Sequence, residues 1–538
     1  MNGKILNLVL MLMLVSSSLL GPLAPVTGAN ALGEEETLSP QVADSAGFFG
    51  SVPDEVVRYG ADAHPMFIIE VKDGSASDLE SWANQSDDRE MVEDLGKNEM
   101  LVAASLDDVT GSFLSDGLAA KSYVADVDYN MKLSVNPVEA PKSESAHQQS
   151  TLMDVVDYTR GDFGPNGVAY SDDFNESTPE DVRQVIGDDN VSAEGSNVDV
   201  AVLDTGLNTA NGAVFGNGSD GSTIRVDASY NALDDTNGLS NVSDGNGHGT
   251  WVASMIAANH SNASYDGVAP QADLHIGKVL ADDGSGSTAD IVKGLDWACS
   301  SDEVDVVSMS LGSPVHSDAL EEAVTDCANS DDKVVSIAVG NSRINPATRY
   351  ISSPADADSE GVIAVAASNV EEPADGDDKK AMSAYFSEVG PDSGLQDVET
   401  RGQGPDVAAP GTEITAKTPT EDGFVEESTL SGTSMATPVV SGSIAVAMDA
   451  GSTPTDNPQD VREDVRSTTT VMPEAGTTEV GAGLVDVENL VNEDTHPVDE
   501  QEDARNEDAV ARDSANRALS TQQTGLLDRA FSGLGEVF

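Results

Sequence analysis

The chain has 538 residues, enough for one to three domains and a large buried core. It carries 26 Lys and Arg against 95 Asp and Glu, a net charge of −69, which argues against a nucleic-acid partner because phosphate binding needs basic patches. Such a chain repels itself at low salt, whereas in molar salt the Debye length falls to about 3 Å and the repulsion is screened. The acidic residues run through segments with strong strand and helix patterns, so we expect a folded, salt-adapted protein rather than a disordered acidic tail.

Residues 1–31 have the pattern of a signal peptide. An apolar run over 5–20 precedes Ala29-Asn30-Ala31, a small-x-small cleavage site. The alternative is a membrane anchor, but serines inside the run and Pro22 after it make the run short for a span. No twin arginine precedes it, so we expect export by the general secretion route and no stable membrane span after cleavage.

The next segments predict a small folded unit and a linker. Residues 32–64 are acidic and have no clear pattern, whereas residues 65–130 predict a small α+β unit. In that unit the expected strands are 66–71, 100–106 and 122–130, and the expected helices are 76–85 and 107–117. Residues 131–160 include a polar stretch with two prolines, which is typical of an exposed linker.

Residues 161–490 predict an open α/β domain. Short Val, Ile and Ala runs alternate with helical stretches: "VDVAVLDTG", "ADLHIGKVL", "VDVVSMSLG", "KVVSIAVGN", "GVIAVAAS" and "PDVAAPG". Such runs suit strands buried on both faces, so we expect an open, mostly parallel sheet with helices on both faces. Ligands of such sheets bind at the carboxyl ends of the strands. Residues 491–538 form an acidic tail, which is either a disordered tail or a weak capping helix, or else contacts a membrane or partner.

The two cysteines, Cys299 and Cys327, each end a helical pattern. If both helices are crossovers between parallel strands, their C-terminal ends lie side by side and a disulfide is geometrically possible. Two small buried thiols are the alternative, and the sequence leaves both open.

Three polar residues lie where the fold would hold them still. Asp204 ends a buried strand, His248 opens a helical run between glycines, and Ser434 opens another run among small residues. Each residue alone is weak evidence for catalysis, but together the three supply the parts of a nucleophilic triad. Asp…His…Ser is the chain order of one known triad family. Small residues around Ser434 would let a substrate carbonyl reach both the hydroxyl and the helix N-terminus.

The motifs "VAVLDTG", "GHGTWVA", "SMSLG", "AVGN" and "SGTSMATP" occur in the order found in the subtilases, or subtilisin-like serine proteases. The chain resembles that family over about residues 160–490. The resemblance implies a serine endopeptidase that cleaves extended polypeptides, with Ser434 as nucleophile, His248 as general base and then acid, and Asp204 as the carboxylate that orients it. Asn341 and the Ser434 backbone N–H would bind the oxyanion. The residues implied to grip the substrate strand are Gly284, Ser285, Gly286, Ser310, Leu311 and Gly312, with Ala338 to Gly340 lining the pocket for the residue before the cut.

The resemblance also gives the front unit a role. Residues 65–130 are similar to the family's inhibitory propeptide, an intramolecular chaperone, and self-cleavage would fall between about 130 and 160. A permanent accessory domain is the alternative. The acidity resembles that of halolysins, secreted subtilases of extremely halophilic archaea, and a monomer is expected.

No cofactor is expected for the chemistry. The loop between Asp204 and His248 is rich in Asp, Asn and Gly, which suits structural calcium, but no metal site is assigned. Trp251 and Ser254 depart from the family's usual His and Gly, so packing near His248 should differ. The competing functions are a dedicated processing protease, a non-catalytic pseudoprotease and, more weakly, an esterase, which would need no extended backbone grip.

Overall fold

The computed structural model of the chain describes a front unit and a main domain. The described residues are 56–60, 63–86, 88–112, 115–135, 177–210, 213–214, 224–343, 349–357, 359–369, 381–390, 404–420, 425–453, 457–497 and 500–501. The predicted signal peptide, most of the acidic segment, the linker from 136 to 160 and the tail beyond 501 lie outside them. Within these ranges no helix is both long and apolar enough to cross a membrane.

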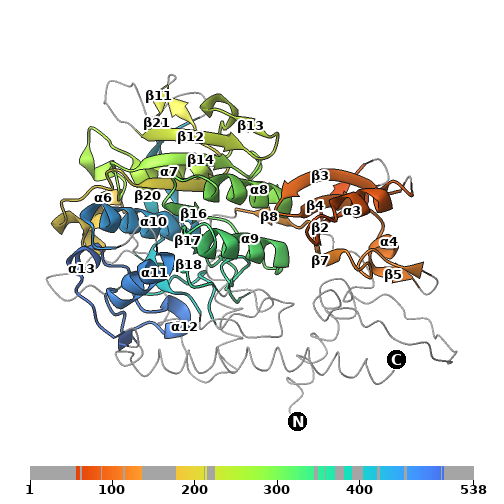
Figure 1. Cartoon of the computed structure of the whole chain (residues 1–538). Coiled ribbons are helices and arrows are strands. Elements are labelled where there is room, and N and C mark those ends of the chain that lie inside the picture. Colours follow the sequence, from red (N-terminus) through yellow and green to blue (C-terminus); the bar gives the residue numbers. More distant parts are fainter. Residues whose placement is uncertain are drawn as a thin grey trace, which may run out of the picture.

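The front unit, residues 56–131, is a five-stranded antiparallel sheet with two helices (Figure 1). Its strands are β1 (Arg58–Tyr59), β2 (His64–Val71), β3 (Glu90–Gly96), β4 (Glu99–Ala103) and β7 (Val124–Tyr129), and its helices are α3 (Ala76–Ala83) and α4 (Leu106–Thr110). β2 pairs with β1, β4 and β7, and β3 forms an edge beside β4. Alternate residues of β2 point to opposite faces: Phe67 and Ile69 pack with α3, whereas Met66 and Ile68 face the main domain.

The structure confirms most of the elements expected in this unit. The strands at 66–71, 100–106 and 122–130 and the helix at 76–85 are present, although β4 ends at Ala103. The helix expected over 107–117 is wrong beyond Thr110, because Gly111 has a φ of 90° and the chain turns into the short hairpin of β5 (Gly111–Ser112) and β6 (Ser115–Asp116). Strand β3 was not expected, since its sequence, EMVEDLG, is too polar to show an apolar alternation.

An eight-stranded sheet organises the main domain, in the order β13-β12-β14-β9-β16-β17-β18-β19. Only the β12–β13 pair is antiparallel. The strands are β9 (Asp199–Asp204), β12 (Arg225–Asn231), β13 (Thr236–Asn237), β14 (Asp273–Lys278), β16 (Val306–Met309), β17 (Val334–Ala338), β18 (Val362–Ser368) and β19 (Val407–Pro410). This confirms the expected open, mostly parallel sheet.

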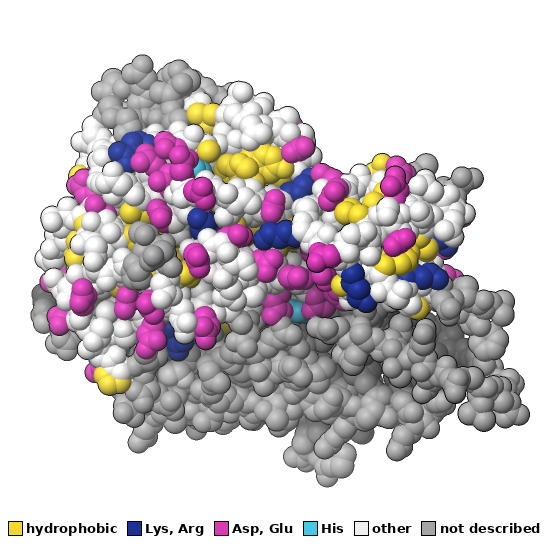
Figure 2. Space-filling view, in the orientation of Figure 1, with side chains coloured by type: hydrophobic (Ala, Val, Ile, Leu, Met, Phe, Trp, Pro, Cys, Tyr) yellow, Lys and Arg dark blue, Asp and Glu magenta, His cyan; other side chains and the backbone are white. Residues whose placement is uncertain are grey.

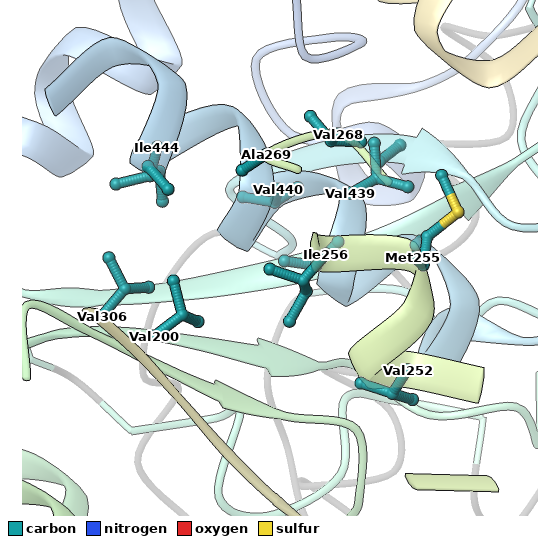
Figure 3. Packing of buried hydrophobic residues seen from close by; sticks show 14 of the residues in the cluster. Val200, Val252, Met255, Ile256, Val268, Ala269, Val306, Val439, Val440 and Ile444 are labelled. Atoms are coloured by element: carbon teal, nitrogen blue, oxygen red, sulfur yellow. The ribbon is translucent and has the colours of Figure 1, made fainter. Parts of the chain in front are cut away.

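Helices cover both faces of this sheet. On one face, Val200 and Val202 of β9 belong to a core formed with α6 (Pro179–Val185), α7 (His248–Ala257), α10 (Thr433–Ala450), α11 (Pro458–Ser467) and α13 (Val487–Asn492), part of which is seen in Figure 3. On the other face, Ala201 and Leu203 pack with α8 (Thr288–Cys299), α9 (Asp318–Asn329) and α12 (Thr477–Val480). Strand β9, which ends at Asp204, is therefore buried on both sides.

Short elements complete the main domain. They are the turns η2 (Asp188–Asn190), η3 (Leu239–Asn241) and η4 (Ala263–Tyr265), the hairpin strands β10 (Thr209–Ala210) and β11 (Ala213–Val214), and the antiparallel pair β20 (Ile414–Pro419) and β21 (Val425–Leu430). Ordered packing continues past the expected boundary at 490, because the buried Gln501 side chain exchanges hydrogen bonds with the backbone of Met472.

A disulfide joins the C-terminal ends of α8 and α9. Cys299 is the last residue of α8, Cys327 lies in the final turn of α9, and their Cα atoms are 5.4 Å apart. The two helices pack side by side as crossovers of the parallel sheet. Of the two alternatives that the sequence left open, the structure has the disulfide.

The front unit lies against α8 and α9 (Figure 1). Asp128 Oδ2 accepts hydrogen bonds from the Ser317 hydroxyl at 2.7 Å and the Ala319 N–H at 3.2 Å, and Asn130 Oδ1 accepts from the Ala289 N–H at 3.0 Å. The front unit therefore supplies acceptors for N–H groups in the first turns of both helices, which a helix cannot satisfy internally. Beyond it, β8 (Lys132–Ser134) runs onto the main domain.

Candidate active site

Asp204 and His248 form a buried pair. Asp204 is the last residue of β9 and His248 the first residue of α7. Nδ1 of His248 lies 2.8 Å from Oδ1 and 3.0 Å from Oδ2 of Asp204, and both side chains are 1% exposed. Burial works against a charged ring, but the charge and hydrogen bond of Asp204 outweigh it, so the pKa of His248 is raised above its ordinary value.

Asp244 ties the two segments of this pair together, and the sequence reasoning missed it. Its Oδ1 accepts from the Thr205 hydroxyl at 2.8 Å and the Gly247 N–H at 2.7 Å, and its Oδ2 accepts from Thr250. The end of β9 and the start of α7 thus share one buried carboxylate. Asp244 lies three residues before Gly247, the N-cap of α7, so it does not stand at the position where the sequence predicts a capping residue.

Ser434 is the second residue of α10 and is buried. Its Oγ donates to the Ser310 carbonyl at 3.2 Å, while the Ser310 hydroxyl donates to the Ser434 carbonyl at 2.9 Å. In the described part of the chain, His248 Nε2 is buried without a hydrogen-bond partner. The structure therefore pairs His248 with Asp204 but leaves the Ser434 hydroxyl on Ser310.

Pro438 explains why the Ser434 carbonyl is available to Ser310. In a regular helix that carbonyl would accept from the N–H four residues later, but Pro438 has none. Pro438 is the sixth residue of α10, beyond the first turn, where a missing N–H costs no helical hydrogen bond. The Ser310 hydroxyl replaces the hydrogen bond that Pro438 cannot donate to the Ser434 carbonyl.

Thr433 fixes the side chain of Asn341. Oδ1 of Asn341 accepts from the Thr433 N–H at 2.9 Å and the Thr433 hydroxyl at 3.1 Å, and the same hydroxyl accepts from the Gly340 N–H at 3.2 Å. Because a backbone N–H can only donate, the acceptor must be the amide oxygen, and Nδ2 points elsewhere. Thr433 was not singled out from the sequence.

The residues expected to grip a substrate hold a strand of the chain itself. β15 (Ser285–Ser287), which includes Gly286, pairs antiparallel with β8, and the Val135 N–H donates to the Gly284 carbonyl at 2.9 Å. On the side of β8 away from β15, Ser134 forms an antiparallel bridge with Gly312. Ser310 and Leu311 lead into that position from β16. Ala338 is the last residue of β17, and Gly340 lies two residues beyond it.

Among the described residues, one group could hold a metal ion: His316, Asp318 and Glu321 at the start of α9. His316 Nε2 lies 3.1 Å from Asp318 and 3.2 Å from Glu321, and Nδ1 lies 3.1 Å from Asp356. Ion pairs account for this cluster without a metal, and it includes no residue of the loop between Asp204 and His248. No cofactor or calcium site is assigned.

Comparisons with known proteins agree with this geometry. A model of the Subtilase family matches residues 195–502. The chain belongs to the subtilase family. It is 35% identical over 302 residues to Subtilisin DY of Bacillus licheniformis, covering 55% of this chain and 91% of that protein, and 35% identical over 297 residues to Subtilisin Savinase of Lederbergia lenta, covering 55% and 90%.

The subtilase fold is also seen in a solved structure. Fervidolysin from Fervidobacterium pennivorans, described as a keratinolytic enzyme related to subtilisin, aligns with a TM-score of 0.56 at 20% identity over 84% of this chain. The chain spans 65% of the length of fervidolysin. As a subtilase, the chain is a serine-type endopeptidase that acts on polypeptides.

The two departures from the usual subtilase motif are both accommodated in α7. Trp251 is fully buried and its Nε1–H donates to the Ser428 carbonyl of β21 at 3.1 Å. The Ser254 hydroxyl donates back to the Thr250 carbonyl at 2.6 Å. Trp251 therefore links the helix that carries His248 to the β20–β21 hairpin.

Proposed function

We propose that Asp204, His248 and Ser434 are the catalytic triad of this subtilase. The observation that carries the proposal is the buried Asp204–His248 pair, in which His248 Nε2 has no hydrogen-bond partner among the described residues, on a helix, α7, that packs against α10. In the reaction the Ser434 hydroxyl breaks its hydrogen bond to the Ser310 carbonyl and donates to His248 Nε2 instead. It then transfers its proton to Nε2 and its oxygen attacks the scissile carbonyl. His248 then returns the proton to the leaving amine, while Asp204 stabilises the imidazolium.

The oxyanion of the tetrahedral intermediate is bound by two donors. One is Nδ2 of Asn341, since Oδ1 is taken by Thr433. The other is the backbone N–H of Ser434, which belongs to the first turn of α10, where N–H groups have no intrahelical acceptor. Both act together with the positive end of the helix.

The raised pKa of His248 sets the pH dependence. His248 must be neutral to accept the Ser434 proton, so activity is lost as pH falls through its pKa. We expect the acid limb of kcat/KM, which reports the free enzyme, to have its midpoint above pH 6.5. The measurement is kcat/KM for a peptide substrate from pH 5 to 9 at constant molar salt, and a midpoint below 6.5 would contradict the assignment.

The front unit acts as an intramolecular inhibitor, and the enzyme is made as a self-cleaving zymogen. Support comes from the segment 132–135, which lies between β15 and Gly312, where the bound strand of a substrate belongs. Cleavage within 136–160 would leave this segment bound as a product and free the main domain once it dissociates.

Salt adaptation of the halolysin type follows from the charge. Acidic side chains are spread over both the front unit and the main domain (Figure 2).

Acidic side chains also meet where the front unit docks against α8 and α9. Burial there, followed by the charges of Glu322, Glu70 and Asp128, raises the pKa of Glu99 to about 8. Because the docked pKa is raised, docking is strongest when Glu99 is protonated and weakens as pH rises toward 8.

A secreted enzyme of this charge should require molar salt. We expect activity and the melting temperature to fall steeply, and reversibly at first, when NaCl is lowered from 3 M to 0.1 M, because self-repulsion is then unscreened. Casein digestion and thermal melts across this range make the test, with sucrose at matched osmolality as the control. Full activity and an unchanged melting temperature at 0.1 M would contradict salt adaptation.

A further inference from the structure

Glu388 is buried beside the turn that carries Asn341. The residue is 1% exposed. Its backbone N–H donates to the Gly340 carbonyl at 3.0 Å, and its Oε1 accepts from the Ser342 N–H at 2.9 Å. One residue thus holds the chain immediately before and immediately after Asn341.

The second carboxylate oxygen strengthens this hold. Oε2 accepts from the Ser352 hydroxyl at 2.7 Å, and the Ser352 N–H donates to the Val339 carbonyl at 2.9 Å. Gly340 has a φ of 110°, and a Cβ placed on it would lie 2.2 Å from Oε2. The carboxyl group therefore packs directly on the backbone of Gly340, an approach that only glycine permits.

Asn341 is consequently fixed from two sides. Thr433 holds the oxygen of its side chain, and Glu388 holds its backbone. Oxyanion stabilisation depends on donors placed to within about 0.5 Å. We propose that Glu388 is a positioning residue that keeps the Gly340–Ser342 turn in place so that Nδ2 of Asn341 meets the developing oxyanion. The inference rests on the oxyanion role proposed for Asn341.

The experiment is a double-mutant cycle between Glu388 and Asn341. Glu388→Met keeps the side-chain volume but removes both acceptors. Burial raises the pKa of Glu388 to about 8, against the hydrogen bonds from Ser352 and Ser342. Glu388→Gln keeps one acceptor for the Ser342 N–H and is the conservative variant.

We expect Glu388→Met to lower kcat by about 30-fold and Glu388→Gln by about 3- to 10-fold, with KM changed less than threefold, since a loosened Asn341 weakens only the transition state. In an Asn341→Ala background, where the donor is already gone, each Glu388 variant should change kcat less than twofold. Asn341→Ala alone should cost about 10²- to 10³-fold. Thermal melts establish that each variant is folded, and if Glu388→Met is not, Glu388→Gln decides.

Asp406→Asn is the control, because Asp406 is a buried carboxylate that accepts from the Ala364 N–H and pairs with Arg462 and Arg466, and its side chain has no hydrogen bond to residues 340–342 among the described residues. Its kcat should stay within twofold of wild type. The proposal is overturned if the Glu388 variants keep wild-type kcat, or if their losses persist in the Asn341→Ala background. Unchanged kcat in Asn341→Ala alone overturns the oxyanion assignment instead.

Discussion

Replacing Ser434 by alanine is expected to lower kcat on peptide substrates by about 10⁶-fold, the loss that follows removal of the nucleophile from a triad of this kind. The fold should survive, because in the described part of the chain the hydroxyl makes one hydrogen bond, to the Ser310 carbonyl, and the Ser310 hydroxyl can still donate to the carbonyl of residue 434. The measurement is turnover of a chromogenic peptide in molar salt.

Ser443→Ala provides the matched control for this variant. Ser443 lies on the same helix, is fully buried, and its hydroxyl donates to the Val439 carbonyl at 2.7 Å. It should retain kcat within a fewfold of wild type. Residual activity of Ser434→Ala above about one per cent would mean that another nucleophile does the chemistry.

Asp204→Asn is expected to cost about 10⁴-fold in kcat at neutral pH. Asp204 accepts from Nδ1 of His248, so the ring keeps its proton there and leaves Nε2 free to accept one from Ser434. An asparagine amide can donate to Nδ1 and so favours the opposite tautomer, in which Nε2 carries the hydrogen. The loss should appear in kcat with little change in KM.

The other end of the same strand offers a control for this substitution. Asp199 begins β9 and its Oδ1 lies 2.9 Å from Nε2 of His275, so Asp199→Asn also alters an Asp–His pair, in which the His275 side chain is buried and the Asp199 side chain is 18% exposed. It should lower stability without a comparable loss of kcat. Equal losses for the two variants would show that Asp204 acts through folding rather than through the tautomer of His248.

Much of the main domain was predictable from the sequence because its strands are buried on both faces. A short, near-continuous apolar run such as the one ending at Asp204 fits few structures other than a buried strand. The motifs around His248, Asn341 and Ser434 placed each polar residue at the start or end of a helix or strand. Apolar patterns did not predict β3, an edge strand whose polar sequence has no alternation of apolar residues. They also predicted too long a helix after Thr110, where one glycine ends it.

The supporting contacts of the site were not predictable in the same way. Asp244, Thr433 and Glu388 act through hydrogen bonds between segments that are far apart in sequence, and Glu388 lies 47 residues beyond Asn341. No local pattern sets such a residue apart from any other acidic residue in a chain that has 95 of them. Its burial together with its hydrogen bonds to the Asn341 turn, which the sequence does not give, distinguishes Glu388.

Intact-mass spectrometry of protein produced in molar salt, wild type beside Ser434→Ala, tests the central proposal most directly. We predict that the wild type is found as a species that begins between residues 136 and 160, whereas Ser434→Ala remains joined to the front unit. Two proteins of the same mass, both joined or both cut, would contradict a zymogen that matures through its own Ser434.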